Sequence, residues 1–154
     1  MSGASRRTSS RAIGTTTSAL LFGSVLLAIS GCGSSSSPTQ AELQTRLVTI
    51  MSGLNAANAK ATAHLTSMSS DQEKLTALRE TIPAYQAANN AFLRMGLTGQ
   101  GATDVRTLVA DDSRMLADIQ IGNGPAIVQD SQVAAGALEA VRADVGLPPS
   151  TSGG

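Results

Sequence analysis

The segment 103-TDVRTLVADDSRMLADIQI-121 carries the clearest structural signal in the sequence. Its apolar residues recur at steps of three and four, which places them on one face of an α-helix. They are Val105, Leu108, Val109, Met115, Leu116 and Ile119. Thr103 is suited to cap the first turn, and Gly122-Asn123-Gly124 ends the pattern. The segment therefore predicts an amphipathic helix that must bury its apolar face against other elements.

A longer stripe with the same spacing precedes it. We expect a helix from Pro38 to about Ser69, with Ser37 as its N-cap, because proline is favoured at the first helical position. The apolar residues of this stripe are Leu43, Leu47, Ile50, Leu54, Ala57, Ala61, Leu65 and Met68.

A second helix is expected to begin at the capping box Ser70-Asp71-Gln72-Glu73. Pro83 lies inside it and predicts either a kink or two short helices, because proline removes a backbone hydrogen bond. Tyr85 and Phe92 are expected to be the largest core residues. The three glycines in residues 96–102 predict the loop that follows.

A last helix is expected to start at Pro125 and to end at Gly146, where Gly146-Leu147 fits a Schellman ending. Four helices joined by short loops predict an all-α, antiparallel up-down four-helix bundle over residues 38–146. Residues 147–154 are expected to form a disordered tail.

The charges are distributed unevenly along the 154 residues. Lys and Arg number 11 and so do Asp and Glu, but the first 31 residues hold three arginines and no acidic residue. The part from Cys32 onward therefore carries a net charge of −3. A mildly acidic body argues against nucleic-acid binding, which needs a basic face. The single cysteine excludes an intrachain disulfide and a cysteine zinc site.

Residues 1–31 have the three parts of a secretory signal peptide. The start, MSGASRRTSSR, is basic; the run ALLFGSVLLAI at residues 19–29 is apolar; and two small residues stand directly before Cys32. This order predicts export from the cytoplasm, with the basic end staying on the cytoplasmic side.

The four residues Ile29-Ser30-Gly31-Cys32 resemble a lipobox, the cleavage site of bacterial lipoproteins. The resemblance covers residues 1–32 and implies that a signal peptidase cuts between Gly31 and Cys32, whose thiol carries diacylglycerol. Two or more acyl chains give stable membrane attachment. Residues 32–37 would then be a short, serine-rich tether that keeps the bundle near the cell membrane, on its extracytoplasmic side. The sequence does not choose between an inner and an outer membrane.

Three alternatives to this interpretation stay open. The uncharged stretch 12–31 is long enough for an uncleaved anchor, although its first third is poorly apolar. An ordinary secreted protein would leave a free thiol at Cys32. Ser5-Arg6-Arg7 resembles a weak twin-arginine export signal, so the export route is also open.

No set of residues predicts catalysis. His64 is the only histidine and has no accompanying motif, so a surface or half-buried position explains it. The methionines at 51, 68, 95 and 115 could ligate copper or haem, but packing of flexible side chains in the core explains them without a further assumption. Phosphate-binding loops and nucleophile elbows are missing from the sequence. We therefore expect no enzyme, metal or cofactor.

Four aspartates lie within the helix predicted at 103–121. Asp104, Asp111 and Asp118 are spaced by seven and share a face, which is usually a solvated one. Asp112 instead falls among the apolar positions, so its carboxylate should point inward and needs a partner. Arg79, Arg94 and Asn89 are the candidates; the other possibility is a ligand pocket that includes Tyr85 and Asp112.

These observations predict an exported, membrane-anchored lipoprotein with a non-enzymatic helical domain. Its role is expected to be structural, or to be the binding of another protein in the cell envelope. The alternative is a helical bundle that binds a small molecule or cofactor at the membrane surface.

Overall fold

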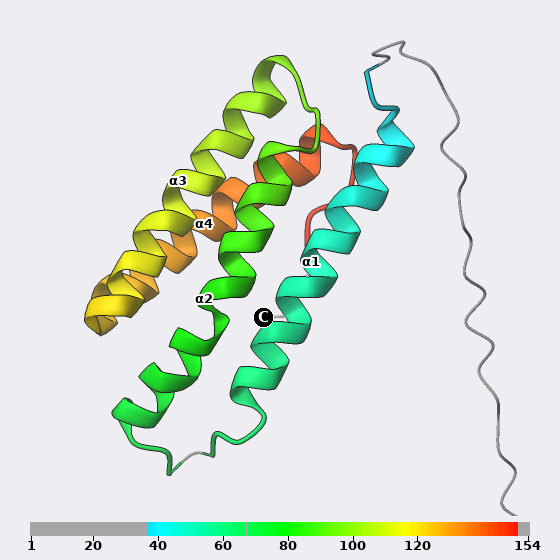
Figure 1. Ribbon diagram of the computed structural model, residues 1–154. Helices are drawn as coiled ribbons and strands as arrows, with labels where there is room; N and C mark the ends of the chain where they lie inside the picture. Colours follow the sequence, from blue (N-terminus) through cyan, green and yellow to red (C-terminus); the bar gives the residue numbers. More distant parts are fainter. Residues whose placement is uncertain (1–36, 67, 151–154) are drawn as a thin grey trace, which may run out of the picture. The chain divides into compact units, whose positions relative to one another are not determined.

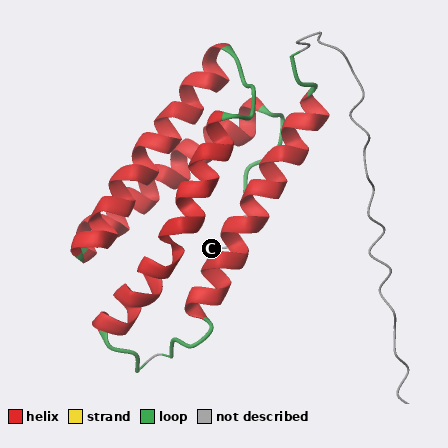
Figure 2. Ribbon diagram, in the orientation of Figure 1, coloured by secondary structure: helices red, strands yellow, loops and turns green. Residues whose placement is uncertain are grey.

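The computed structural model describes residues 37–66 and 68–150, which form four α-helices (Figure 1). They are α1 (Gln40–Thr62), α2 (Asp71–Leu93), α3 (Gly99–Ile121) and α4 (Gly124–Asp144). Every regular element in these two ranges is helical (Figure 2). Helices consecutive in sequence pack side by side, α1 on α2, α2 on α3 and α3 on α4. The all-α, antiparallel four-helix bundle predicted from the periodicity is confirmed.

The first helix is shorter than predicted at both ends. Its N-cap is Thr39 and not Ser37, because the Thr39 hydroxyl accepts from the Glu42 amide while the Glu42 carboxylate accepts from the Thr39 amide at 2.7 Å. This reciprocal pair satisfies two free donors that a proline start would leave open. At its other end the helix stops at Thr62. Met68, placed on the helical stripe from its spacing, is 93% exposed, so that assignment is wrong.

The second helix begins as predicted. The side chain of Ser70 accepts from the amide of Glu73, whose carboxylate accepts from the amide of Ser70 at 2.6 Å. Pro83 lies inside one continuous helix and does not divide it into two.

The third helix begins at Gly99, four residues before the predicted start at Thr103. Residues 99–102 are therefore helical and not part of the loop. Gly101 explains the difference, because a Cβ there would lie 3.2 Å from Leu97 and 3.3 Å from the carboxylate of Asp144. The glycine that looks like a loop signal instead permits close packing of α3 on its neighbours.

The last helix ends as predicted. Gly146 has a φ of +69°, the amide of Leu147 donates to the carbonyl of Arg142, and the amide of Gly146 donates to that of Ala143. This is the Schellman pattern. Beyond this ending, the amide and hydroxyl of Ser150 both donate to the Glu139 carboxylate. Residues 151–154 lie outside the described range.

The core has two parts of different size. The large cluster takes side chains from all four helices: Leu47, Leu54, Ala88, Phe92, Met95, Val105, Leu108, Ala134, Val141 and Val145. The small cluster consists of Met115, Leu116 and Ile119 of α3, with Leu75 and Ile82 of α2 and Ile127 of α4 packed against them. Tyr85 packs against both clusters and marks their boundary. The small cluster contains no side chain from α1.

Candidate functional site

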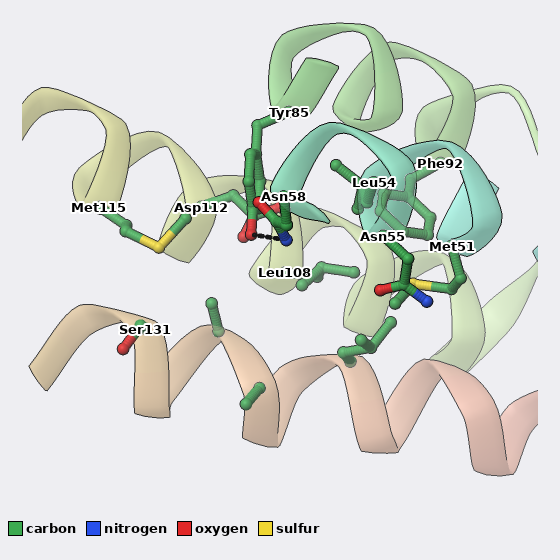
Figure 3. A pocket seen from close by; sticks show the side chains of 13 residues that line it. Met51, Leu54, Asn55, Asn58, Tyr85, Phe92, Leu108, Asp112, Met115 and Ser131 are labelled. Atoms are coloured by element: carbon green, nitrogen blue, oxygen red, sulfur yellow. Dashed lines mark hydrogen bonds between the residues drawn. The ribbon is translucent and has the colours of Figure 1, made fainter. Parts of the chain in front are cut away.

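A pocket of about 150 Å³ lies where the two clusters meet. Every helix contributes to its wall. The lining residues are Met51, Leu54, Asn55 and Asn58 of α1, Tyr85 and Phe92 of α2, Leu108, Asp112 and Met115 of α3, and Ser131, Ala134, Ala135 and Leu138 of α4. Figure 3 shows this arrangement from close by.

The mouth of the pocket lies between α1 and α4. Asn55 of α1 and Ser131 and Ala135 of α4 are exposed members of its lining. The same two helices meet at the Pro38 end, where the side-chain amides of Gln40 and Gln44 donate to the backbone carbonyl of Val145 at 3.3 and 2.9 Å. These contacts join α1 to α4 at the Pro38 end, and the pocket opens between the two helices farther from that end.

Asp112 is the charged residue of the pocket wall. It is 4% exposed, as its position in the apolar pattern predicted. No hydrogen bond or ion pair reaches its carboxylate from any residue in 37–66 or 68–150. Its neighbour Asp111 is equally buried but forms an ion pair with Arg114 at 2.9 Å. Two adjacent aspartates of equal exposure thus differ in that Asp111 has a partner, whereas Asp112 lines the pocket without one.

The partners predicted for Asp112 are elsewhere. Arg79 donates to the carbonyls of Ile119 and Gln120, at 3.3 and 2.7 Å. Asn89 is buried, and its Oδ1 has no hydrogen-bond donor in the described part of the chain. Arg94 lines a separate groove between α1 and α2. The expectation of a pairing with one of these residues is wrong, because each of them points to a different part of the bundle.

The surroundings of Asp112 change its protonation. Burial raises the pKa of its carboxyl from the ordinary 3.8 to about 6, and the nearby charge of Asp111 adds to the effect. A carboxylate at the wall of a narrow pocket, without a partner, is less hydrated than one at the surface, which favours the protonated form. At neutral pH the group is nevertheless mainly ionised, so the pocket contains a negative charge.

Tyr85 reaches the same pocket from α2. Its hydroxyl accepts a hydrogen bond from the side-chain amide of Asn58 at 3.3 Å (Figure 3). Because the hydroxyl accepts this bond, its own hydrogen remains available to a further acceptor. The two residues that the sequence singled out as a possible ligand pocket, Tyr85 and Asp112, are therefore brought to one cavity.

Asn55, Asn58 and Ser131 were not recognised from the sequence. Asn58 stands four positions after Leu54, so it shares the same helix face, whereas Asn55, one position after Leu54, does not. That position on the inner face was the available signal for Asn58. Ser131 had no comparable signal, because α4 has many small residues on every side.

The other residues considered from the sequence do not gather into a site. His64 is exposed just beyond α1. Asp104 and Asp118 are half-buried and Asp111 is buried, so the expected solvated face is wrong for this row. Burial, with Asp118 beside it, raises the pKa of Asp130 of α4, and burial with Asp104 raises that of Asp144. The row therefore faces the seam between α3 and α4. Within the described residues, no three His, Cys, Asp or Glu side chains are placed to hold a metal ion.

The predicted lipidation and cleavage residues, Cys32 and Gly31, lie outside the described residues. Among the helices that are described, none is long and apolar enough to cross a membrane.

Comparisons with known proteins return no relative. Neither a family model, nor a curated protein, nor a solved structure matches this chain.

Proposed function

We propose that the mature protein is a lipid-anchored, non-enzymatic domain of the bacterial cell envelope that binds a small molecule in the four-helix pocket. One observation carries the binding role: the buried carboxylate of Asp112 has no partner among the described residues and lines an open cavity. A buried charge without a partner costs stability that a well-packed apolar residue would not. A ligand that meets Asp112 compensates for this cost.

A role in binding another protein has less support from the geometry. The large apolar side chains that are exposed come from all four helices and from the α1–α2 loop. They are Val48, Met68, Leu78, Leu93, Ile121, Val128 and Val133. Single exposed apolar side chains on several elements are ordinary for a monomeric protein and do not by themselves identify a contact area.

The anchor rests on the resemblance of residues 29–32 to a lipobox. If Cys32 carries the lipid, the seven residues from Gly33 to Thr39 join it to α1, and they span no more than about 25 Å when fully extended. The pocket would then be held near the membrane surface. The body, with its net charge of −3, gains no attraction from anionic lipids, so the lipid must supply the attachment.

Native mass spectrometry of the protein extracted gently from its own membrane tests both parts. We expect a chain cut before Cys32 with diacylglycerol attached, and a non-covalent small molecule bound to it. Replacing Cys32 by Ser should remove the lipid. An intact leader would overturn the anchor, and a folded protein without any bound molecule would overturn the binding role.

A matched pair of variants locates the bound molecule. Ala135→Leu places a larger side chain at the mouth of the pocket, whereas Ala56→Leu makes the same change at an exposed α1 position outside the pocket lining. We expect the first to lose the molecule and the second to keep it. Equal retention by both would show that the molecule sits elsewhere.

A further inference from the structure

The residues that line the pocket favour a positively charged ligand. Its polar lining consists of Asp112, Tyr85, Asn55, Asn58 and Ser131, and it includes no lysine, arginine or histidine. The nearest arginine in sequence, Arg114, is held by Asp111, and Arg79 is held by two carbonyl groups. The described part of the chain therefore offers the Asp112 carboxylate no cation of its own.

The rest of the pocket wall is mainly apolar and includes two polarizable methionine side chains. Leu54, Leu108 and Leu138 supply hydrocarbon surface, and Met51 and Met115 supply thioether groups. This wall suits the carbon skeleton of a ligand, while a bare metal ion would prefer several oxygen ligands. A cavity of about 150 Å³ accommodates a molecule about the size of benzene.

Tyr85 adds a second feature that favours a cation. It stands on α2 and packs against both core clusters, so its ring is held in place. The ring face attracts a positive charge, and the effect is strongest where water is excluded. The Tyr85 hydroxyl is oriented by Asn58.

Resting on the binding role proposed above, we propose that the ligand is a small organic ammonium ion. Its nitrogen lies against the Asp112 carboxylate beside Tyr85, and its hydrocarbon part contacts the leucine and methionine side chains. The ligand replaces the counter-ion that the chain does not provide, which explains why a charge is retained at a position where an apolar residue would pack.

Isothermal titration of the full-length protein in detergent with three compounds of similar shape tests this assignment. The probes are cyclohexylammonium, cyclohexanol and cyclohexanecarboxylate, at pH 7.5. A charge-assisted hydrogen bond contributes more than a neutral one, so we expect the ammonium ion to bind at least about tenfold tighter than the alcohol. The carboxylate should not bind, because it would be repelled by Asp112.

Two variants of adjacent residues complete the test. Asp112→Asn keeps the shape of the side chain and should reduce ammonium binding to the level of the alcohol. Asp111→Asn removes an equally buried charge outside the pocket lining and should reduce ammonium binding by much less than Asp112→Asn, because Asp111 acts on the ligand only from a longer distance. Circular dichroism melts show whether each variant is folded at the titration temperature.

The outcomes separate the two proposals. If the alcohol binds wild type as tightly as the ammonium ion, the ligand class is wrong, whereas the pocket as a binding site stands. If both aspartate variants weaken binding equally, the effect is one of general charge and the assignment to Asp112 is overturned. If no probe binds, the ammonium assignment fails, and the mass spectrum of the membrane-extracted protein still decides whether the pocket holds another molecule.

Discussion

The two halves of the bundle differ in how they are packed. Toward the Pro38 end, all four helices share the large cluster, in which Leu47, Val141 and Val145 are fully buried. Toward the Gly122 end, the small cluster joins α2, α3 and α4 without α1. The pocket lies at the change from four-helix to three-helix packing. This difference indicates why a small bundle can have both a buried core and a cavity, because the cavity lies where the number of helices around the core changes.

Charge follows the same division. Residues 37–50, 83–110 and 133–150, toward the Pro38 end, contain four basic and four acidic residues. Residues 51–66, 68–82 and 111–132, toward the Gly122 end, contain four basic and seven acidic ones. The whole net charge of the described body therefore belongs to the half that contains the small cluster. A cation that approaches the pocket is attracted from that side.

The largest effect is expected for Phe92→Ala in the large cluster. Phe92 is 2% exposed, and removing a buried aromatic ring leaves a cavity that costs about 3–5 kcal/mol of unfolding free energy. Chemical denaturation with urea measures the change. A loss below about 1 kcal/mol would remove Phe92 from the core and contradict the tight packing of this half.

A smaller loss is expected for Ile119→Ala in the small cluster. Ile119 is as buried as Phe92, but only three helices meet around it and the site can relax. We therefore expect a cost near the lower end of the range for such changes, about 2 kcal/mol. Urea denaturation under the same conditions gives the comparison, and a loss equal to that of Phe92→Ala would mean that the two halves are equally well packed.

Asp112→Asn should stabilise the protein above pH 6. Because the folded pKa of about 6 lies above the ordinary 3.8, the folded state keeps its proton to higher pH than the unfolded chain. The free energy of unfolding therefore falls as pH rises between these two values, and the loss is complete above them. Asparagine carries no charge and avoids this loss. We therefore expect the free energy of unfolding to rise by about 1–2 kcal/mol at pH 7.5, a value that allows for solvent screening in the open pocket.

Denaturation of the wild type and the variant from pH 4 to 8 measures this difference. The pKa values of Asp130 and Asp144 are also raised, whereas those of Glu42, Glu73 and Glu139 are lowered. These groups are common to both proteins and cancel in the difference. Parallel curves over the whole pH range would show that Asp112 titrates as an ordinary surface carboxyl group.

The smallest effect is expected for the helix caps. Thr39→Ala removes the first capping bond of α1 at the Pro38 end, and Ser70→Ala removes its counterpart in α2 at the other end. Each should cost about 1 kcal/mol. Amide exchange of Glu42 and Glu73 should rise in the respective variant, and unchanged exchange in either would mean that the cap is not formed in solution.

The sequence predicted the helix ends correctly where a local motif specifies a single backbone structure. The Ser70 capping box and the Gly146-Leu147 ending each specify their own hydrogen bonds, and both were predicted correctly. Gly101 was predicted to lie in a loop, but its small size permits close contact with Leu97 and Asp144. This contact can be recognised only when the packing of α3 on its neighbours is known. The capping box of Thr39 was overlooked in favour of Pro38, although Glu42 stands at the required spacing.

The site was partly predictable for the same reason. Tyr85 and Asp112 could be assigned to the interior from helical spacing alone. Which side chains face Asp112 depends on how four helices rotate about their axes, and spacing within one helix contains no information about that. Of the residues proposed as its partners, Arg79 and Asn89 are on α2 and Arg94 caps its end, but none of them lines the pocket.

The carbon NMR signal of the Asp112 carboxyl group, followed from pH 4 to 8 with and without cyclohexylammonium, tests the binding site most directly. Without the probe we expect a titration midpoint of about 6. With saturating probe the midpoint should fall toward the ordinary range, because a cation beside the carboxylate favours its charged form. An identical midpoint with and without the probe would show that the cation does not meet Asp112, and would contradict the site described here.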